Sequence, residues 1–273
     1  MNDNISAELK QKEAELERLL AQWSSAVVAF SGGVDSTFLL YKTSMILDKE
    51  AVLAVTARSP LHPRAEIEAA FNISTRLGIN HRAVETHELA EPAFTRNTPE
   101  KCYICKKMLY NQINKIKDDM QYAVLLDGAN LEDTADYRPG QVAAQEQGAV
   151  SPLQVARLDK NDIRLLSRHY QLPTWNKPAM ACLASRLPYG EEISATKLKT
   201  IEQAEQILRD AGVAGDTRVR YHGPIARIEV NPEQQGNIMD YRELIVNKLK
   251  ALGFKYVVLD LEGFSSGSLN REL

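Results

Sequence analysis

The sequence has no long apolar segment and little imbalance of charge, and these two absences limit what the chain can be. No apolar run approaches the roughly 20 residues that a membrane-spanning helix needs. The amino-terminal residues lack a basic stretch followed by an apolar core, so we expect no export signal and a cytoplasmic location. A net charge of −3 gives no general attraction to nucleic acid or to an anionic membrane. We therefore expect a soluble globular protein with neither of these partners.

Cysteine is also scarce, with three residues in 273. An odd number of cysteines in a chain without an export signal argues against a disulfide framework and favours metal or redox chemistry. Two of them lie in the pattern Cys102-Tyr103-Ile104-Cys105, which places both on one face of a helix, and the third is Cys182. Three interpretations stay open: unrelated buried cysteines, a zinc site completed by His169 or His222, and an iron–sulfur cluster held by three thiolates.

The Walker lysine loop and the dinucleotide-binding fingerprint are both missing, but a different glycine turn is present. The segment Ser31-Gly32-Gly33-Val34-Asp35-Ser36-Thr37 follows an apolar, β-prone run and precedes residues with helical spacing. Adjacent glycines permit a tight turn that gathers backbone N–H groups, and the positive end of the following helix points at the same place. The hydroxyl groups of the segment can add further donors. The pattern predicts a triphosphate or pyrophosphate site, with an ordinary strand-to-helix turn as the alternative.

Alternating strands and helices predict an α/β fold with a doubly wound parallel sheet over residues 1–188. Its strands are expected within 24–30, 51–56, 81–86 and 122–126. Ligands of such sheets bind beyond the carboxyl ends of the strands, where the glycine turn lies. The composition changes near residues 187–190, and we expect a smaller α+β domain over 189–273. Its expected strands are 217–222, 225–230 and 254–261, and its expected helices are 194–211 and 237–251.

Charged residues near the ends of the expected strands are candidates for binding Mg²⁺ and phosphate. Three acids follow the fourth strand: Asp127, Asp133 and Asp136. Each is either a Mg²⁺ ligand or part of a solvated acidic loop, and Asp35 is the stronger candidate because the glycine turn positions it. Three basic residues are candidate cations for the phosphate charge: Lys106, Arg138 and Lys177.

Two arginines alternate on the first expected strand of the smaller domain. Arg218 and Arg220 therefore face the same side, and Arg227 and Glu229 do the same on the next strand. Converging guanidinium groups suit bidentate binding of a phosphate. A salt-bridged polar face of the sheet explains the pattern equally well.

Four segments together resemble the LarE-type sulfurtransferase family of the PP-loop ATP pyrophosphatases, over nearly the whole chain. They are SGGVDST, LDGAN with the following DYRPG, WNKPAMACLASRLPYG, and RVRYH with ARIEV. The resemblance implies an ATP-dependent enzyme of nickel-pincer cofactor synthesis. Its substrate would be pyridinium-3,5-biscarboxylic acid mononucleotide, whose carboxylates are adenylated and converted into thiocarboxylates.

The family resemblance also implies one of two sources of sulfur. One kind of member gives up the sulfur of a single cysteine, which becomes dehydroalanine. The other kind has three cysteines that hold a 4Fe–4S cluster and relay sulfide catalytically. The present pattern resembles the second kind, which argues against a sacrificial role for Cys182.

The same resemblance assigns roles to particular residues and partners. The expected catalytic residues are Cys182, Cys102, Cys105, Asp35 and Lys106. ATP is expected to bind Ser31, Gly32, Gly33, Val34, Asp35, Ser36, Thr37, Ala57, Gly128 and Arg138, with Mg²⁺ on Asp35 and Asp133. Substrate is expected at Ser185, Arg186, Arg218 and Arg220. We further expect a separate sulfide donor and a homo-oligomer. A PP-loop tRNA thiolase and a non-catalytic nucleotide-binding sensor remain as rival functions.

Overall fold

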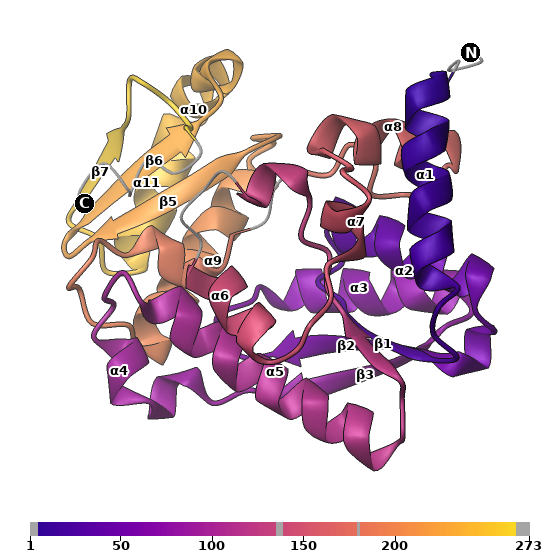
Figure 1. Ribbon diagram of the computed structural model, residues 1–273. Helices are drawn as coiled ribbons and strands as arrows, with labels where there is room; N and C mark the ends of the chain where they lie inside the picture. The colour runs from indigo at the N-terminus through magenta and orange to yellow at the C-terminus, as the bar shows by residue number, and fades with distance from the viewer. Residues whose placement is uncertain (1–4, 135–138, 179–180, 266–273) are drawn as a thin grey trace. The chain divides into compact units, whose positions relative to one another are not determined.

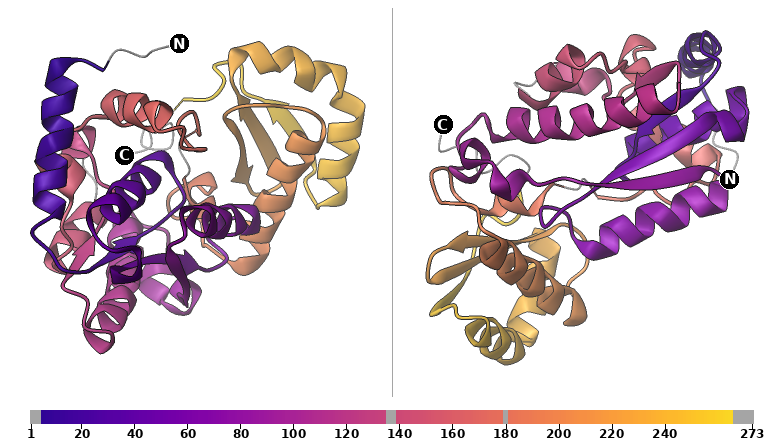
Figure 2. Two further views of the ribbon diagram at one scale, coloured as in Figure 1. Left: turned by 90° about the vertical axis from the view of Figure 1, so that its right-hand side faces the viewer. Right: turned by 90° about the horizontal axis from the view of Figure 1, so that it is seen from below.

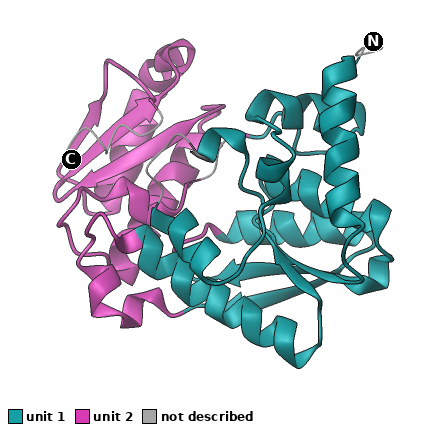
Figure 3. Ribbon diagram, viewed as in Figure 1, with its two compact units in different colours: residues 1–59, 64–86, 102–177 teal, residues 60–63, 87–101, 178–273 magenta. Residues whose placement is uncertain are grey.

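The computed structural model describes residues 5–134, 139–178 and 181–265, and the chain divides into two compact units (Figure 3). Unit 1 contains residues 1–59, 64–86 and 102–177, whereas unit 2 contains residues 60–63, 87–101 and 178–273. Two short segments from the first half of the chain therefore belong to unit 2. The expected domain boundary between residues 188 and 189 stays a prediction, because compactness does not by itself measure independent folding.

Unit 1 is built on a parallel sheet with the strand order β3-β2-β1-β4. The strands are β1 (Ala26–Ala29), β2 (Val52–Arg58), β3 (Asn80–Glu85) and β4 (Val124–Leu126). In the central register Val27 lies beside Leu53 on one side and Leu125 on the other. All three side chains are buried, as expected for parallel strands that are covered on both faces.

Helices cover both faces of this sheet (Figures 1 and 2). Their bounds are α1 (Ala7–Leu20), α2 (Val34–Ile46), α3 (Arg64–Leu77), α5 (Lys101–Asp119), α6 (Pro139–Glu146), α7 (Pro152–Val155) and α8 (Lys160–His169). Val28 belongs to a core cluster with Phe38 of α2 and Leu166 of α8. The neighbouring Val27 belongs to a second cluster with Ile113 of α5. Val27 and Val28 are adjacent in β1, so their side chains face opposite sides of the sheet. Helices therefore pack on both faces, and the predicted doubly wound α/β fold is confirmed.

Unit 2 contains a small mixed sheet with the order β5-β6-β7. Its strands are β5 (Thr217–His222), β6 (Ile225–Val230) and β7 (Tyr256–Leu259), and its α-helices are α4 (Pro92–Thr95), α9 (Ala195–Asp210), α10 (Gln235–Asp240) and α11 (Arg242–Ala251). Strand β6 pairs antiparallel with β5 and parallel with β7. The helix expected over 237–251 is interrupted at Tyr241, whose ψ of 16° is not helical. The predicted small α+β architecture is otherwise confirmed.

None of the helices in the described part of the chain is both long and apolar enough to cross a membrane.

Candidate functional site

The glycine turn connects β1 to α2 and has a fixed conformation of its own. Gly32 has a φ of +69°, in the left-handed region that favours glycine, and a Cβ there would stand 3.0 Å from the Cβ of Ala70. The hydroxyl oxygens of Ser31 and Ser36 lie 3.0 Å apart, and the Ser36 hydroxyl lies 3.3 Å from the Gly33 carbonyl oxygen. The turn is thereby shaped before any ligand binds.

The first turn of α2 has polar groups that the described residues leave without hydrogen bonds. Gly33 is the N-cap and supplies no side chain to the first N–H groups of the helix. The hydroxyl of Thr37 and the Oδ1 atom of Asp35 are buried and lack partners within the described chain. Buried polar groups are usually paired, and a bound phosphate or cation would supply partners to this set. The N–H groups and the hydroxyl suit a phosphate, while the carboxylate oxygen suits a cation.

Two lysines from distant parts of the chain contact the same turn. The Lys160 ammonium, at the start of α8, forms an ion pair with Asp35 Oδ2. The Lys177 ammonium lies 3.0 Å from the Gly32 carbonyl oxygen and 2.7 Å from a carboxylate oxygen of Glu66. Arg164 donates to the Lys177 carbonyl oxygen at 2.8 Å, which fixes the segment that carries this lysine. Sequence reasoning identified Lys177 but missed Lys160, because no local pattern distinguishes it.

The end of β4 approaches the glycine turn through Gly128. A Cβ at Gly128 would lie 3.0 Å from the backbone nitrogen of Ser36. The preceding Asp127 is buried, and its carboxylate accepts hydrogen bonds from the Ser151 hydroxyl at 2.6 Å and the Ala129 N–H at 3.1 Å. These bonds hold the strand end in place. The absence of a side chain at Gly128 then leaves room for the first turn of α2.

Replacing Gly128 with alanine is expected to displace the first turn of α2 and to weaken nucleotide binding. The added methyl group would meet backbone atoms of Ser36, which cannot move aside as a flexible side chain would. Overpacking of this kind typically costs about 1–3 kcal/mol. The measurement is the free energy of unfolding together with ATP affinity. Gly236→Ala is the matched control, because its Cβ would meet nothing within 4 Å. Unchanged ATP affinity in Gly128→Ala would contradict this account.

His81 on β3 connects α3 with the residue that precedes the glycine turn. Its Nε2 atom lies 2.7 Å from the Thr56 hydroxyl, which lies 2.5 Å from the Phe30 carbonyl oxygen. Its Nδ1 atom lies 2.7 Å from the Ser74 hydroxyl. Because Thr56 has one hydroxyl hydrogen and donates it to Phe30, His81 must carry its own hydrogen on Nε2. A neutral ring with this tautomer accepts at Nδ1 from the Ser74 hydroxyl, which then cannot give its one hydrogen to the Phe71 carbonyl oxygen 2.9 Å away.

The chain should lose stability in acid through His81. Burial of the imidazole lowers the pKa of His81 from 6.5 to about 4. Between these two values the unfolded chain binds this proton more readily than the folded chain, so the free energy of unfolding falls as the pH falls. The expected loss is at most about 3 kcal/mol. His81→Gln should remove this component in urea unfolding at pH 7 and pH 5, whereas the exposed His169→Gln should not. Equal pH dependence in both variants would contradict the expectation.

The cysteines occupy different units, and no disulfide is present among the described residues. Cys102 and Cys105 lie in the first turns of α5 in unit 1, and Cys182 precedes a short 3₁₀ helix (Leu183–Arg186) in unit 2. The Lys106 ammonium lies 5.6 Å from the centre of the Tyr110 ring. In the part of the chain that the structure describes, no three side chains of His, Cys, Asp or Glu form a metal site.

Ser185 and three predicted arginines of unit 2 lie close together. Arg186 forms an ion pair with Glu205 at 2.7 Å and donates to the Cys182 carbonyl oxygen at 3.1 Å. Arg220 donates to the Ser185 carbonyl oxygen at 2.7 Å. It also pairs with the Oε2 atom of Glu229 at 2.7 Å.

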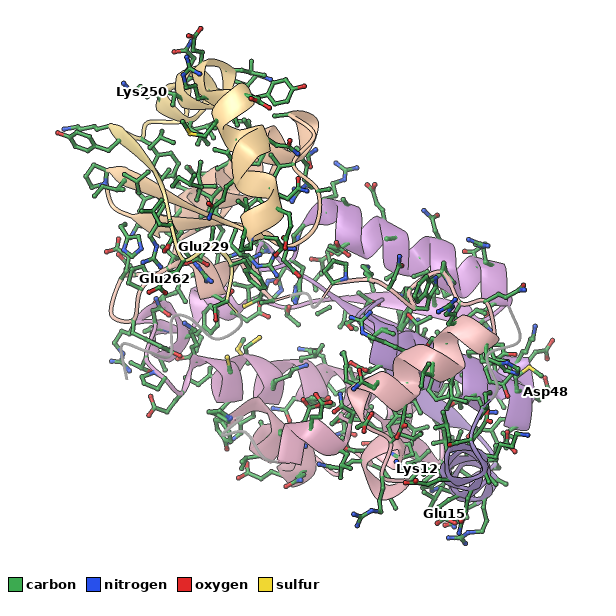
Figure 4. All side chains as sticks on the ribbon, turned by 90° about the horizontal axis from the view of Figure 1, so that it is seen from above. Lys12, Glu15, Asp48, Glu229, Lys250 and Glu262 are labelled. Carbon is green, nitrogen blue, oxygen red and sulfur yellow. The ribbon has the colours of Figure 1, made fainter. Side chains whose placement is uncertain are left out.

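Glu229 is labelled in Figure 4 and is only 1% exposed. The salt-bridged face of the sheet, one of the two interpretations of these arginines, is therefore present. The other interpretation, a phosphate site, stays a prediction.

Arg218 has a longer ion pair than these two arginines, since its Nη2 atom lies 3.6 Å from the Oδ1 atom of Asp216. Its guanidinium lies 4.9 Å from the centre of the Phe264 ring, and it donates to the Thr217 carbonyl oxygen at 2.9 Å. Burial, together with the positive charge of Arg186, lowers the pKa of Arg218. A bound anion would counter both effects by stabilising the charged guanidinium.

Comparison with known proteins shows the family of this chain. A family model described as NAD synthase matches residues 9–196. A protein of Lactiplantibacillus plantarum named pyridinium-3,5-bisthiocarboxylic acid mononucleotide synthase is 38% identical over 267 residues, which cover 98% of this chain and 96% of that protein. The chain belongs to the LarE-type family of PP-loop enzymes.

Other relatives place this LarE-type chain among proteins of similar length. An uncharacterized protein of Synechocystis is 40% identical, with 97% of this chain and 99% of that protein covered. An NH₃-dependent NAD⁺ synthetase of Hyperthermus butylicus is 25% identical, with 74% of this chain and 75% of that protein covered. The family resemblance inferred from the four sequence segments is thus confirmed.

The structure of this LarE-type chain assembles most of the predicted nucleotide residues. The glycine turn, Gly128 and Lys177 all lie in unit 1. Ala57 is buried near the end of β2. Asp133 accepts a hydrogen bond from the Asn130 N–H at 3.0 Å. Two candidates, Asp136 and Arg138, lie outside the described residues. The roles of all these residues in binding ATP or Mg²⁺ stay predictions.

Proposed function

We propose that the chain is an ATP-dependent sulfurtransferase that makes thiocarboxylates from pyridinium-3,5-biscarboxylic acid mononucleotide. The observation that carries the proposal is the 38% identity, over nearly all of both chains, to a protein named as synthase of the bisthiocarboxylic acid product. The glycine turn supports it, because it offers buried donors and a buried carboxylate oxygen at one place.

The proposed reaction has two steps for each carboxylate. A carboxylate oxygen of the substrate attacks the α-phosphorus of ATP, and pyrophosphate leaves with the electron pair of the broken bond. Sulfide then attacks the acyl carbon, and AMP leaves, so that sulfur replaces one carboxylate oxygen. The first step needs neutralisation of the pyrophosphate charge, which Lys177 and the N–H groups at the start of α2 can supply.

The residues present fit a Mg²⁺ ion in the first step. Asp35 offers a carboxylate whose Oδ1 atom has no partner in the described chain, and Mg²⁺ prefers oxygen ligands of this kind. A bound Mg²⁺ would add charge neutralisation for the leaving pyrophosphate. The carboxylate of Asp127, by contrast, is occupied by its hydrogen bonds.

In this proposal the three cysteines are the residues that would hold an iron–sulfur cluster as the sulfur carrier. Cys102 is exposed, Cys105 and Cys182 are partly exposed, and all three sulfurs are outside disulfides. Three thiolates would leave one iron of a 4Fe–4S cluster open, and the bound cluster would present hydrosulfide as nucleophile. Two arginines hold the segment that carries Cys182. Arg186 donates to the Cys182 carbonyl oxygen, and Arg220 donates to the Ser185 carbonyl oxygen. In this proposal Arg218 binds the substrate phosphate.

The proposal is tested by assaying anaerobically purified protein with ATP, Mg²⁺, sulfide and the pyridinium mononucleotide. We expect one pyrophosphate and one AMP for every oxygen that sulfur replaces, with the mass change of that replacement in the mononucleotide. Pyrophosphate formation that does not depend on the mononucleotide would contradict the assigned substrate.

Three observations in this assay separate the proposal from its rivals. Nucleotide binding without any pyrophosphate release would support a sensor. Sulfur incorporation into added tRNA would support a tRNA thiolase. Ammonium in place of sulfide tests for amide formation, the chemistry suggested by the name of the NAD⁺ synthetase relative.

A further inference from the structure

The glycine turn of this chain contains no basic residue. Its seven residues, 31–37, include the acid Asp35 but no lysine or arginine, whereas a Walker loop ends with a lysine that reaches the β and γ phosphates. Any basic side chain that helps to neutralise a triphosphate bound here must therefore come from elsewhere in the chain. In the described part of unit 1, two ammonium groups contact the turn, those of Lys160 and Lys177.

These two lysines differ in the partner that neutralises them. Lys177 pairs with Glu66 on α3 and contacts the turn at the Gly32 carbonyl oxygen. Lys160 pairs with Asp35, the acid of the turn itself. The side chain of Lys160 is 27% exposed, so it is partly in contact with solvent.

The backbone that carries Lys160 is firmly fixed. Lys160 is the first residue of α8, which Asp159 begins as N-cap of a capping box closed by Asp162. Lys12 of α1, labelled in Figure 4, forms an ion pair with Asp162 at 2.7 Å. The helix also packs on α2 through buried Ile163 and Leu166. Only the long side chain of Lys160 needs to move for its ammonium to change partners.

Lys160 and a divalent cation require the same carboxylate. The ammonium occupies Oδ2 of Asp35, and the Oδ1 atom is buried without a partner in the described chain. A carboxylate that coordinates Mg²⁺ attracts an ammonium less strongly, because its charge is then neutralised. The displaced ammonium would be left beside the phosphates of the nucleotide, which carry the nearest uncompensated negative charge.

We propose that Lys160 is a phosphate-binding cation of this nucleotide site, held on Asp35 until Mg²⁺ and ATP bind and then transferred to the triphosphate. This inference rests on the ATP site of the proposed function. Lys160 keeps the Asp35 charge neutralised in the nucleotide-free chain, so that the carboxylate does not repel ATP. It also couples the two ligands, since Mg²⁺ releases the ammonium that ATP needs.

The test measures two affinities in the Lys160→Met variant. α,β-Methylene ATP, which resists cleavage at the relevant bond, is titrated calorimetrically in the presence of Mg²⁺. Mn²⁺ is titrated without nucleotide and followed by its paramagnetic resonance signal. Loss of the phosphate contact should weaken binding of the ATP analogue by roughly 10- to 100-fold. Loss of the competing ammonium should strengthen Mn²⁺ binding, so the two affinities move in opposite directions.

Two further variants serve as controls. Lys160→Arg keeps the charge and should retain analogue binding within about threefold, because guanidinium and ammonium groups both bind phosphate. Lys177→Met should weaken analogue binding without strengthening Mn²⁺ binding, because its ammonium pairs with Glu66 instead of Asp35.

The outcomes are distinguishable. Failure of the wild-type chain to bind the ATP analogue would overturn the proposed function, and with it this inference. If the wild-type chain binds the analogue, a Lys160→Met variant with unchanged analogue affinity overturns the inference alone. A parallel loss of both affinities also overturns it, because that result indicates a purely structural role.

Discussion

Replacing Asp35 with asparagine is expected to reduce pyrophosphate release by at least about a hundredfold while the chain stays folded. Asparagine preserves the shape of the side chain but removes the negative charge. The variant therefore loses the carboxylate that pairs with Lys160 and that we assign to Mg²⁺. The residue is only partly buried, at 20% exposure, so the neutral amide can be accommodated without unfolding.

The control for this substitution is Asp48→Asn. Asp48 is exposed, is labelled in Figure 4, and accepts a hydrogen bond from the Glu50 N–H, a role that asparagine can also fill. Pyrophosphate release and circular dichroism should both match the wild type in this variant. Release at the wild-type rate in Asp35→Asn would remove Asp35 from the catalytic machinery.

Replacing any one of the three cysteines with alanine is expected to abolish thiocarboxylate formation while sparing pyrophosphate release. The reason is that a cluster held by three thiolates is lost when one ligand is removed, whereas the glycine turn, the proposed ATP site, remains intact. Iron and acid-labile sulfide, measured after anaerobic purification, should fall to background in Cys102→Ala, Cys105→Ala and Cys182→Ala alike. Pyrophosphate release with ATP and the mononucleotide should continue in all three.

A sacrificial cysteine predicts a different pattern among the same variants. Only Cys182→Ala would then lose sulfur transfer, and Cys102→Ala and Cys105→Ala would retain it. The three variants are therefore controls for one another. Loss of adenylation together with sulfur transfer would indicate that the cysteines support the fold instead of the chemistry.

Local patterns were sufficient to predict the glycine turn and two strands of the smaller sheet. Glycine at position 32 has the positive φ that a tight turn between strand and helix requires, and the two adjacent glycines indicate such a turn. The strands 217–222 and 225–230 were predicted at the bounds of β5 and β6, where charged residues such as Arg218 and Arg220 alternate. Such features depend on neighbours within a few residues.

Partners from distant segments could not be predicted in the same way. Lys160 reaches Asp35 across 125 positions of sequence, and nothing in its own surroundings signals that contact. Arg220 was expected either to bind a phosphate or to join a salt-bridged face of the sheet, and the structure pairs it with Glu229 on the neighbouring strand and with the Ser185 carbonyl oxygen. The sequence identifies charged residues that share a face, but tertiary packing decides which of them pair with one another.

The most direct test of the central claim is a multiple-turnover reaction with isotopically heavy sulfide, followed by mass spectrometry of both product and protein. The protein is incubated anaerobically with ATP, Mg²⁺ and the pyridinium mononucleotide. We predict heavy sulfur in the thiocarboxylate product, product in large excess over protein, and an unmodified Cys182. The account would be contradicted by product that carries light sulfur and does not exceed the amount of protein, if dehydroalanine is also found at position 182.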